Sequence, residues 1–418
     1  MFIESKYKIE NSLKMSCDLS QEFTVIGMNK EALIEEDKNL EGEDLNFSYP
    51  KFLISKDTNL RIENALTYTY NALKNNNIVL LNECHNVPQD RLFFYTLLDS
   101  LQHYGFKSIF LETLGYVPND SVYAQNNSIE DWGYYTHENV FHQVSHKLKN
   151  RNYKLYSYEV TYPRKIDTLR NNNKLYFINN AEANWIPIEA DSLLLKNFFS
   201  TNDNIQREAE QALNIYEKII KNKIKKAFIY CGYTHNFKSS TFMGGMLQHL
   251  MKEKIYSIDQ MCLREHSDIK YENLLYTKYA TVTYPFIITD KHNNTIHTIR
   301  YTNYITDTLF DVSIAFPRSI YINNRPTWLE LNGDRKRYKL NTLMDVSANT
   351  DYLITIYDIE HDFKKNKDKT LEDIPVDVFQ VIGSGKDYDA ILTPNKKYRF
   401  IAFKDGKIIT DKIIDTNE

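Results

Sequence analysis

Two apolar runs of strand length, far apart in the chain, end in the same way. The first spans Ile78–His85 (IVLLNECH), and the second spans Ala227–His235 (AFIYCGYTH). Each run ends at a histidine three residues after a small or turn-forming residue, Asn82 or Gly232, and each precedes a stretch with helical spacing. In an open α/β sheet, the ligand crevice lies outside the carboxyl ends of the strands. The pair therefore predicts one site that is built from two distant segments.

Further strand-like and helix-like stretches alternate around these two runs. Apolar and β-branched runs predict strands at residues 78–83, 108–113, 154–160, 175–178, 226–233 and 254–260. Helical spacing predicts helices at residues 60–73, 90–104, 137–150, 205–222 and 241–253. Such alternation is typical of βαβ units, in which helices connect parallel strands. We therefore expect an α/β fold with a mainly parallel sheet and flanking helices.

The pattern changes after about residue 265. Residues 279–289 and 294–301 are rich in β-branched and aromatic side chains, and we expect them to add antiparallel strands to the main sheet. The last stretch predicts a small all-β module with strands at 352–357, 378–382, 398–403 and 407–414. Asp405-Gly406 is a hairpin signal between the last two of these strands.

The length of the chain favours more than one domain, since 418 residues exceed the size of an ordinary single domain. We expect three parts. They are an N-terminal extension over residues 1–50, an α/β domain over residues 51–345 and a C-terminal β module over residues 346–418.

Composition excludes several classes of protein. An apolar content of 42% supports a large core, and a net charge of -4 with scattered Lys and Arg argues against nucleic-acid binding. No run approaches the roughly 20 apolar residues of a membrane span, and the first residues lack the apolar region of a signal peptide. The four cysteines show no close pairing, which fits reduced thiols. A cytoplasmic protein is expected, unless a leader has been removed, and its partner would be a small-molecule or peptide substrate.

Glu83 and His85 are the first candidates for chemistry. They lie two residues apart at the end of a strand, where alternation places both on one side. A carboxylate beside an imidazole is a general-base arrangement, and it is equally a pair of metal ligands. A capped strand end with a hydrogen-bonded histidine would have the same sequence.

Other charged residues close the later strands. Glu112 ends the second predicted strand and Glu159 the third, and a buried glutamate is costly unless it is paired. His235 supplies a second imidazole at the later strand end. Arg207 opens a helical run, where it can clamp a carboxylate or orient a site glutamate; the alternative is an exposed helix face.

Three further patterns have simpler interpretations. Gly244-Gly245 lies inside a helical stretch at a cost of roughly 1 kcal/mol per residue, which a close backbone approach would explain. Cys84 and Cys231 are expected to be small buried fillers. His142 and His146 have the i, i+4 spacing of metal ligands, but we interpret them as a polar helix face.

The ordered set of motifs resembles a superfamily that unites erythromycin esterase-like proteins with ChaN-like haem-binding proteins and Tiki-type metalloproteases. The matching pieces, in order, are Asn82–His85, Gly105–Glu112, Arg207–Ile215, Gly232–His235 and Met243–Leu247. Three features depart from the pattern of the family. Asn82 replaces the opening glycine, the first motif has E-x-H spacing, and Gly232 stands where the esterase branch often has a second histidine.

The resemblance implies roles for these residues. His85 would be the general base or a metal ligand, Glu83 and Glu112 its carboxylate partners, His235 the second imidazole and Arg207 a supporting charge. A metal, if present, would be held by Glu83, His85 and His235. The leading expectation is a hydrolase of an ester or amide bond, with or without a divalent metal.

Two alternatives stay open. One is a haem- or metal-binding protein of the ChaN-like type without catalysis, in which one of the 31 tyrosines could serve as an axial haem ligand. The other is a degenerate member in which the β module binds a partner, and its motivating feature is Asn82 in place of glycine.

Overall fold

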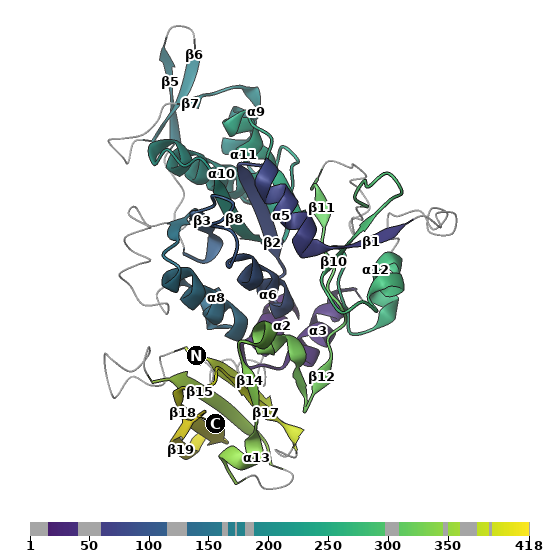
Figure 1. The fold of residues 1–418 in the computed structure, drawn as a ribbon. Coiled ribbons are helices and arrows are strands. Elements are labelled where there is room, and N and C mark those ends of the chain that lie inside the picture. The colour runs from purple at the N-terminus through teal and green to yellow at the C-terminus, as the bar shows by residue number, and fades with distance from the viewer. Residues whose placement is uncertain are drawn as a thin grey trace.

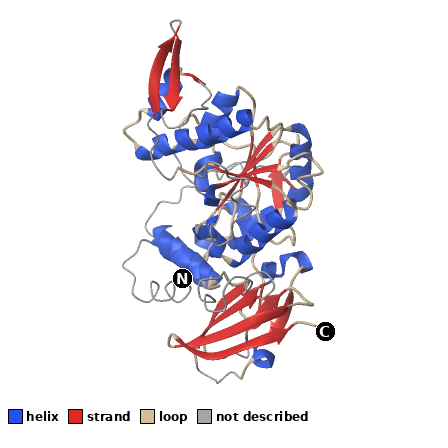
Figure 2. Cartoon of the chain, turned by 90° about the vertical axis from the view of Figure 1, so that its left-hand side faces the viewer, coloured by secondary structure: helices blue, strands red, loops and turns tan. Residues whose placement is uncertain are grey.

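The structure is a computed structural model, and it describes most of the chain. The described ranges are residues 16–40, 60–114, 132–160, 166–171, 174–179, 188–296, 309–345, 350–359, 374–383 and 387–417. A layered α/β unit forms the centre, with a β hairpin at one end and the C-terminal β module at the other (Figures 1 and 2).

A six-stranded parallel sheet is the centre of the α/β unit. Its strand order is β11-β9-β2-β8-β3-β4, and every neighbouring pair is parallel. The strands are β2 (Ile78–Glu83), β3 (Ser108–Leu111), β4 (Lys154–Ser157), β8 (Ala227–Gly232), β9 (Tyr256–Asp259) and β11 (Val312–Ser313). β2 and β8 lie side by side, with Glu83 opposite Gly232. The two matching strand endings are therefore neighbours, as the sequence predicts.

Helices cover both faces of this sheet. They are α5 (Ala65–Asn75), α6 (Pro88–Leu97), α8 (Asn139–Asn150), α9 (Ser192–Phe198), α10 (Asp203–Lys221) and α11 (Met243–Met251). Alternate strand residues face opposite sides. Leu81 and Tyr230 belong to the core cluster that contains α6 and α8, whereas Leu80 and Ile229 belong to the cluster that contains α10 and α11. The predicted α/β fold is confirmed.

Two predictions about the smaller sheets are wrong. The segment at 279–289 does not join the main sheet, because β10 (Phe286–Thr289) pairs antiparallel with β1 (Arg61–Asn64) and β11 takes the edge beside β9. The strand at 175–178 is not part of a βαβ unit. It lies in β6 (Lys174–Asn179), which forms a separate antiparallel sheet with β5 (Ile166–Asn171) and β7 (Ile188–Glu189).

The turn chemistry of the sequence explains the second error. Asn172 and Asn173 separate β5 from β6 in the sequence, and asparagine favours tight turns. The hydrophobic pattern alone does not distinguish a hairpin strand from a short parallel strand. Residues 297–301, the end of the second expected strand, lie outside the described ranges.

The C-terminal module contains four antiparallel strands in the order β16-β15-β18-β19. Their bounds are β15 (Tyr352–Asp358), β16 (Asp377–Val381), β18 (Lys397–Lys404) and β19 (Lys407–Asp415). Asp405 and Gly406 have φ values of 49° and 73°, as a type I′ hairpin requires, so the predicted turn is confirmed. A second pair of strands, β14 (Lys336–Lys339) and β17 (Asp389–Leu392), lies beside this sheet (Figure 1).

The remaining elements are short. They are α2 (Ser16–Val25), α3 (Asn29–Asp37), α12 (Leu274–Tyr279), α13 (Leu340–Leu343), β12 (Tyr321–Ile322), β13 (Arg325–Pro326) and the 3-10 segments η1 (Lys38–Leu40), η2 (Glu112–Leu114), η4 (Tyr134–His137), η5 (Tyr233–Asn236), η6 (Ile269–Tyr271) and η7 (Thr327–Gly333). One core cluster contains Ile26 of the loop after α2, Leu81 of the main sheet and Val378 of the module. The module therefore packs on the α/β unit through a shared core, and the division into three domains stays a prediction.

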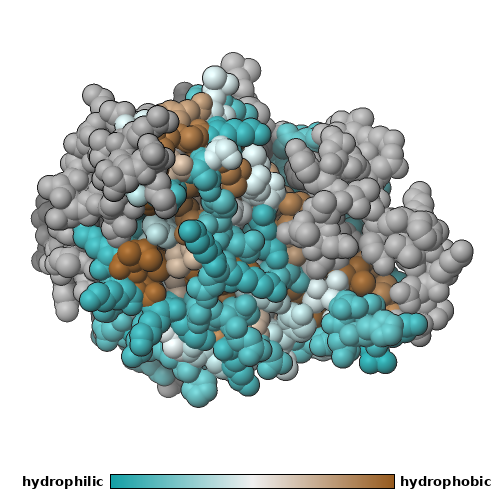
Figure 3. Space-filling model, turned by 90° about the horizontal axis from the view of Figure 1, so that it is seen from above, coloured by the Kyte–Doolittle hydropathy of each residue, from teal (hydrophilic) through white to brown (hydrophobic). Residues whose placement is uncertain are grey.

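The described surface has a polar character on the face seen from above, where hydrophobic side chains form small separate patches (Figure 3). Within the ranges given above, no helix combines the length and the apolar content that a bilayer span requires.

Candidate active site

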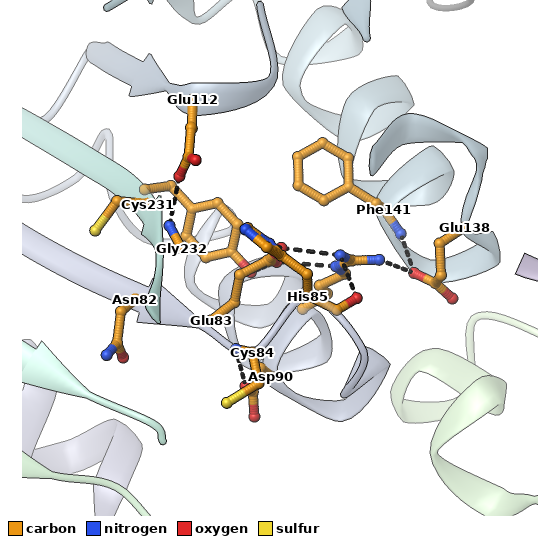
Figure 4. A network of polar contacts seen from close by, with 12 residues as sticks. Asn82, Glu83, Cys84, His85, Asp90, Glu112, Glu138, Phe141, Cys231 and Gly232 are labelled. Atoms are coloured by element: carbon orange, nitrogen blue, oxygen red, sulfur yellow. Dashed lines mark hydrogen bonds and ion pairs between the residues drawn. The ribbon is translucent and has the colours of Figure 1, made fainter. Parts of the chain in front are cut away.

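The structure brings the five predicted side chains together at the carboxyl ends of neighbouring strands. Glu83 ends β2, His85 follows it, Glu112 follows β3, and His235 follows β8 within η5. Arg207 reaches the same place from α10. Figure 4 shows Glu83, His85 and Glu112 gathered beside Gly232. The site predicted from the sequence is thus one compact cluster.

The first half of the cluster is a Glu83–His85 pair. His85 Nδ1 lies 2.8 Å from Glu83 Oε1. Arg91 donates from Nε and Nη2 to the two oxygens of Glu83, both at 2.8 Å, and the Tyr230 hydroxyl donates to Oε2 at 2.5 Å. Burial raises the pKa of Glu83, but the charge of Arg91 and these hydrogen bonds outweigh burial and lower the pKa to about 2. Glu83 is therefore an anion that orients His85, with Nδ1 as the donor and Nε2 as the acceptor.

Arg91 connects this pair to the next layer of the structure. Its Nη2 also donates to the backbone oxygen of His85 at 2.9 Å, and its Nη1 donates to Glu138 Oε2 at 2.9 Å. Glu138 in turn accepts the backbone N–H groups of Val140 and Phe141 and thereby caps α8 (Figure 4). One buried guanidinium in the first turn of α6 therefore links the end of β2 to the start of α8.

The imidazole of His85 is enclosed on three sides. Tyr135 stacks on its face with ring centroids 4.0 Å apart, and Tyr233 meets it edge-on at 4.8 Å. A β-carbon added to Gly232 would overlap the Cε1 and Nε2 edge of the ring. The ring therefore has little freedom to turn away from Glu83.

The second half of the cluster is a Glu208–His235 pair. His235 Nδ1 lies 2.7 Å from Glu208 Oε1, and its Nε2 lies 3.6 Å from Glu112 Oε1. Glu208 Oε2 accepts the backbone N–H of Met243 at the start of α11, at 2.7 Å. Burial lowers the pKa of His235, but the charges and hydrogen bonds of Glu112 and Glu208 outweigh burial and raise the pKa to about 10. His235 is therefore a cation at neutral pH.

Glu112 lies between the two pairs and stays ionised. It accepts the backbone N–H of Gly232 at 2.6 Å and Arg207 Nη2 at 3.2 Å. Burial raises the pKa of Glu112, but His235, and after it His85 and Arg207, hold that pKa well below its usual range. Arg207 also binds Glu159 through both Nε and Nη2. Arg207 is therefore a clamp between two glutamates, as expected, although about two fifths of its side chain is exposed.

Asn82 is fully buried and joins three segments. Its Nδ2 donates to the backbone oxygen of Tyr233 at 2.7 Å and to Asp259 Oδ1 at 3.0 Å, and its Oδ1 accepts Gln260 N at 2.7 Å. Tyr233 has a φ of 39°, a left-handed conformation that is uncommon for a non-glycine residue. Asn82 therefore holds the strained backbone of Tyr233, two residues before His235. Strained backbone of this kind is common at functional sites.

The glycine pair of α11 has the predicted close backbone contacts. A β-carbon at Gly244 would overlap the backbone oxygen of Asn236, and one at Gly245 would overlap that of Ser239. The start of α11 thus lies against the loop that follows His235, where Met243 meets Glu208. The close approach is therefore made to a loop, and the two glycines lie in the first turn of α11 and not in the middle of the helix.

The cysteines and the histidines of α8, which the sequence also singled out, are buried or paired within the fold. Cys84 and Cys231 are buried, as predicted, and burial raises the pKa of both thiols. The interpretation of residues 142 and 146 as a polar helix face is wrong for His142, which is fully buried. Its Nε2 lies 3.0 Å from His146 Nε2.

The donor set does not fit a resident metal. Both oxygens of Glu83 accept hydrogen bonds from Arg91, which occupies this carboxylate. The guanidinium of Arg207 lies 3.5 Å from His235 Nε2, where a shared cation would have to lie. Among the described residues, no group of three His, Cys, Asp or Glu side chains is arranged to hold a metal ion. The haem alternative stays a prediction.

A cavity of about 810 Å³ lies elsewhere, against α6 and η7. Its two charged residues are already paired, since Arg318 binds Glu272 and Glu330 binds Arg337. Neither charged residue of this cavity is therefore a free acid or base, whereas the His85 cluster brings two imidazoles and three carboxylates together.

Sequence reasoning missed several residues that complete the cluster. The position of Arg91 could have been recognised from the sequence. It lies three residues before Phe94 on the apolar face of its helix, where a charge without a partner is costly, and this indicates a buried ion pair. Glu208 carried a similar signal, four residues before the buried Ala212. Tyr135 had none, since only the fold brings η4 against His85.

Substituting Gly232 by alanine should displace His85. The added β-carbon would overlap an imidazole that Glu83 and Tyr135 hold in place, so the ring or β8 must shift. A displacement of about 1 Å can cost roughly 100-fold in turnover. The ¹³C-ε1 NMR resonance of His85 should move in Gly232→Ala, whereas Gly105→Ala, next to the distant Lys226, should leave it unchanged. An unmoved resonance would contradict this arrangement.

The raised pKa of His235 should make stability depend on pH. The protonated histidine stabilises the folded state fully below pH 6.5, and this contribution is lost as the pH rises toward about 10. Each pKa unit corresponds to about 1.4 kcal/mol, so even one unit is measurable. Urea unfolding between pH 6.5 and 9.5 should show a decline in wild type that is flatter in His235→Asn. Parallel curves for the two proteins would refute the assignment.

Comparisons with known proteins identify no family. No protein-family model and no curated protein sequence matches the chain. Among solved structures, the type III effector HopBA1 is similar over 50% of this chain and 88% of its own, with 9% identity and a TM-score of 0.29. The haem-binding ChaN of Campylobacter jejuni is similar over 52% of this chain and 95% of its own, with 11% identity and a TM-score of 0.26. These are weak structural likenesses.

Proposed function

We propose that the protein is a hydrolase that cleaves an ester or amide bond of a small-molecule or peptide substrate. The observation that carries the proposal is the pair of imidazoles at neighbouring strand ends. Each imidazole has its Nδ1 on a buried carboxylate, Glu83 or Glu208, and a third carboxylate lies between them. Pairs of titratable groups whose environments differ are typical of acid–base catalysis.

His85 is the proposed general base. In the neutral imidazole, Nδ1 donates to the Glu83 anion, and the lone pair of Nε2 can then take a proton from a water molecule. The resulting hydroxide attacks the substrate carbonyl, and Glu83 stabilises the imidazolium that forms. The same imidazolium then returns its proton to the leaving oxygen or nitrogen.

His235 and Arg207 are the proposed stabilisers of the oxyanion. Both are cations at neutral pH, and Arg207 Nη1 lies 3.5 Å from His235 Nε2. Fixed positive charges near a developing oxyanion lower the barrier most effectively when they are partly excluded from water. Glu112 and Glu159 hold these two cations in place.

We also propose that the chain is a divergent member of the erythromycin esterase-like, ChaN-like and Tiki-type superfamily. The support is that the five ordered motifs, which are far apart in sequence, converge on one site at the ends of β2, β3 and β8. Asn82 and Gly232, which depart from the pattern of the family, have contacts that fit this site.

A substrate screen tests the proposal. Purified protein, treated with a chelator, is assayed against esters, lactones and amides, beside the variant Glu112→Gln. We expect chelator-resistant hydrolysis that falls about 100-fold or more in the variant, since Glu112 holds Arg207 and faces His235. Hydrolysis that the variant retains in full would place the activity elsewhere. Titration with haemin tests the haem alternative, for which a stoichiometric absorption band would be the sign.

A further inference from the structure

A small polar cavity lies between α8 and the C-terminal module, away from the His85 cluster. Its volume is about 100 Å³, enough for about three water molecules. Its polar wall comes from both sides of the junction, namely from Asn150, His146, Arg335, Asp358, Lys396 and Tyr398. A polar cavity of this size admits a small ion but not a nucleotide or a peptide.

Arg335 has an unusual position in this wall. Its residue is 2% exposed, and its Nη2 donates to the backbone oxygens of Val376 and Ile391. Its Nη1 is buried and has no hydrogen-bond partner in the described structure. Burial lowers the pKa of Arg335, because the guanidinium loses its hydration. Buried charges are normally paired. The Arg335 guanidinium, in contrast, has no carboxylate at hydrogen-bond distance among the described residues.

The neighbouring carboxylates are already taken. Asp377 Oδ1 lies 3.9 Å from Arg335 but only 2.6 Å from Arg325 Nη2. Arg337 binds both Glu330 and Asp389.

Within the cavity wall itself, Asp358 accepts a hydrogen bond from Lys396 Nζ at 2.7 Å. The wall therefore contains two cations, Arg335 and Lys396, and one carboxylate. An anion in the cavity would restore the balance of charge.

We propose that this cavity binds a small oxyanion, a phosphate or a carboxylate, as the counter-ion of Arg335. Lys396 supplies the second charge, and Asn150 and His146 supply polar contacts from α8. Since the wall comes from two parts of the fold, the bound anion stabilises the docking of the C-terminal module on α8. The site is independent of the proposed hydrolase.

The test uses the full chain with inorganic phosphate and with acetate as separate probes, each against sodium chloride at equal ionic strength. Isothermal titration should show saturable binding of at least one of the two anions. At 100 times its dissociation constant, that anion should raise the Tm by about 2 °C or more. The anion that binds identifies the class of oxyanion.

Variants separate a built site from a general salt effect. Lys396→Gln should abolish the saturable heat and the rise in Tm, whereas Lys397→Gln, which removes an exposed neighbouring charge, should retain both. Arg335→Met should also abolish binding. If Arg335→Met does not fold, the result for Lys396→Gln alone decides between the two explanations. The absence of saturable binding by either anion, or an equal rise in Tm in the two lysine variants, would overturn the proposal.

Discussion

Replacement of His85 by glutamine should lower turnover by about 100- to 10,000-fold, the range that a positioned general base contributes. Glutamine keeps a polar side chain but cannot take a proton from water near neutral pH. The fold should persist, because Glu83 keeps its hydrogen bonds to Arg91 and Tyr230. Loss of a single hydrogen bond costs about 1 kcal/mol. Steady-state kinetics on the best substrate of the screen, together with urea unfolding, measure both quantities.

A second histidine provides the control. His103 is exposed, and its ring contact is with Tyr104, far from the site. His103→Gln should therefore leave turnover unchanged. Activity that survives in His85→Gln at the wild-type level would remove His85 from the mechanism. A rise in KM with kcat unchanged would assign it to substrate binding instead of catalysis.

The sequence predicted the parts of the site that lie at strand ends. Strand runs such as Ile78–Glu83 and Ala227–Gly232 have a strong apolar signal, and the parallel arrangement places their carboxyl ends at one edge. Glu83, His85 and His235 could therefore be grouped before their contacts were known. Their grouping follows from topology, since neighbouring parallel strands end together.

The supporting residues could not be predicted in the same way. Arg91, Glu208 and Tyr135 act through contacts between elements whose relative positions are set by packing. A sequence pattern identifies the face of a helix on which a charge lies, but it does not identify the partner of that charge. The hairpin at β5 and β6 was missed for a related reason, because short apolar runs do not reveal which strand they pair with.

The roles of Asn82 and Gly232 become clear only in the fold. As a replacement for glycine, Asn82 suggested a degenerate site, but its hydrogen bonds to Tyr233 and Asp259 give it a positioning role. Gly232 is required because the His85 ring occupies the space of a side chain. His85 therefore takes the room that Gly232 leaves, while Asn82 positions the turn that follows β8.

Substituting Arg91 by methionine should destabilise the protein by about 3–5 kcal/mol, the usual cost of leaving buried carboxylates without their partner. Methionine keeps much of the length of the side chain, so the loss reports charge and hydrogen bonds more than volume. Glu83 and Glu138 would both lose the cation that neutralises them. Chemical unfolding followed by circular dichroism measures the change.

Arg207→Met is the matched comparison, because Arg207 also binds two glutamates but is about two fifths exposed. Solvent at the guanidinium screens these ion pairs, so this variant should lose less stability than Arg91→Met while its turnover falls. The two arginines thus separate stability from catalysis. Arg91 supports the site from within the core, whereas the partly exposed Arg207 is the proposed stabiliser of the oxyanion. A loss of less than 1 kcal/mol in Arg91→Met would show that Glu83 and Glu138 take up protons or water, and that His85 is not held by a buried ion network.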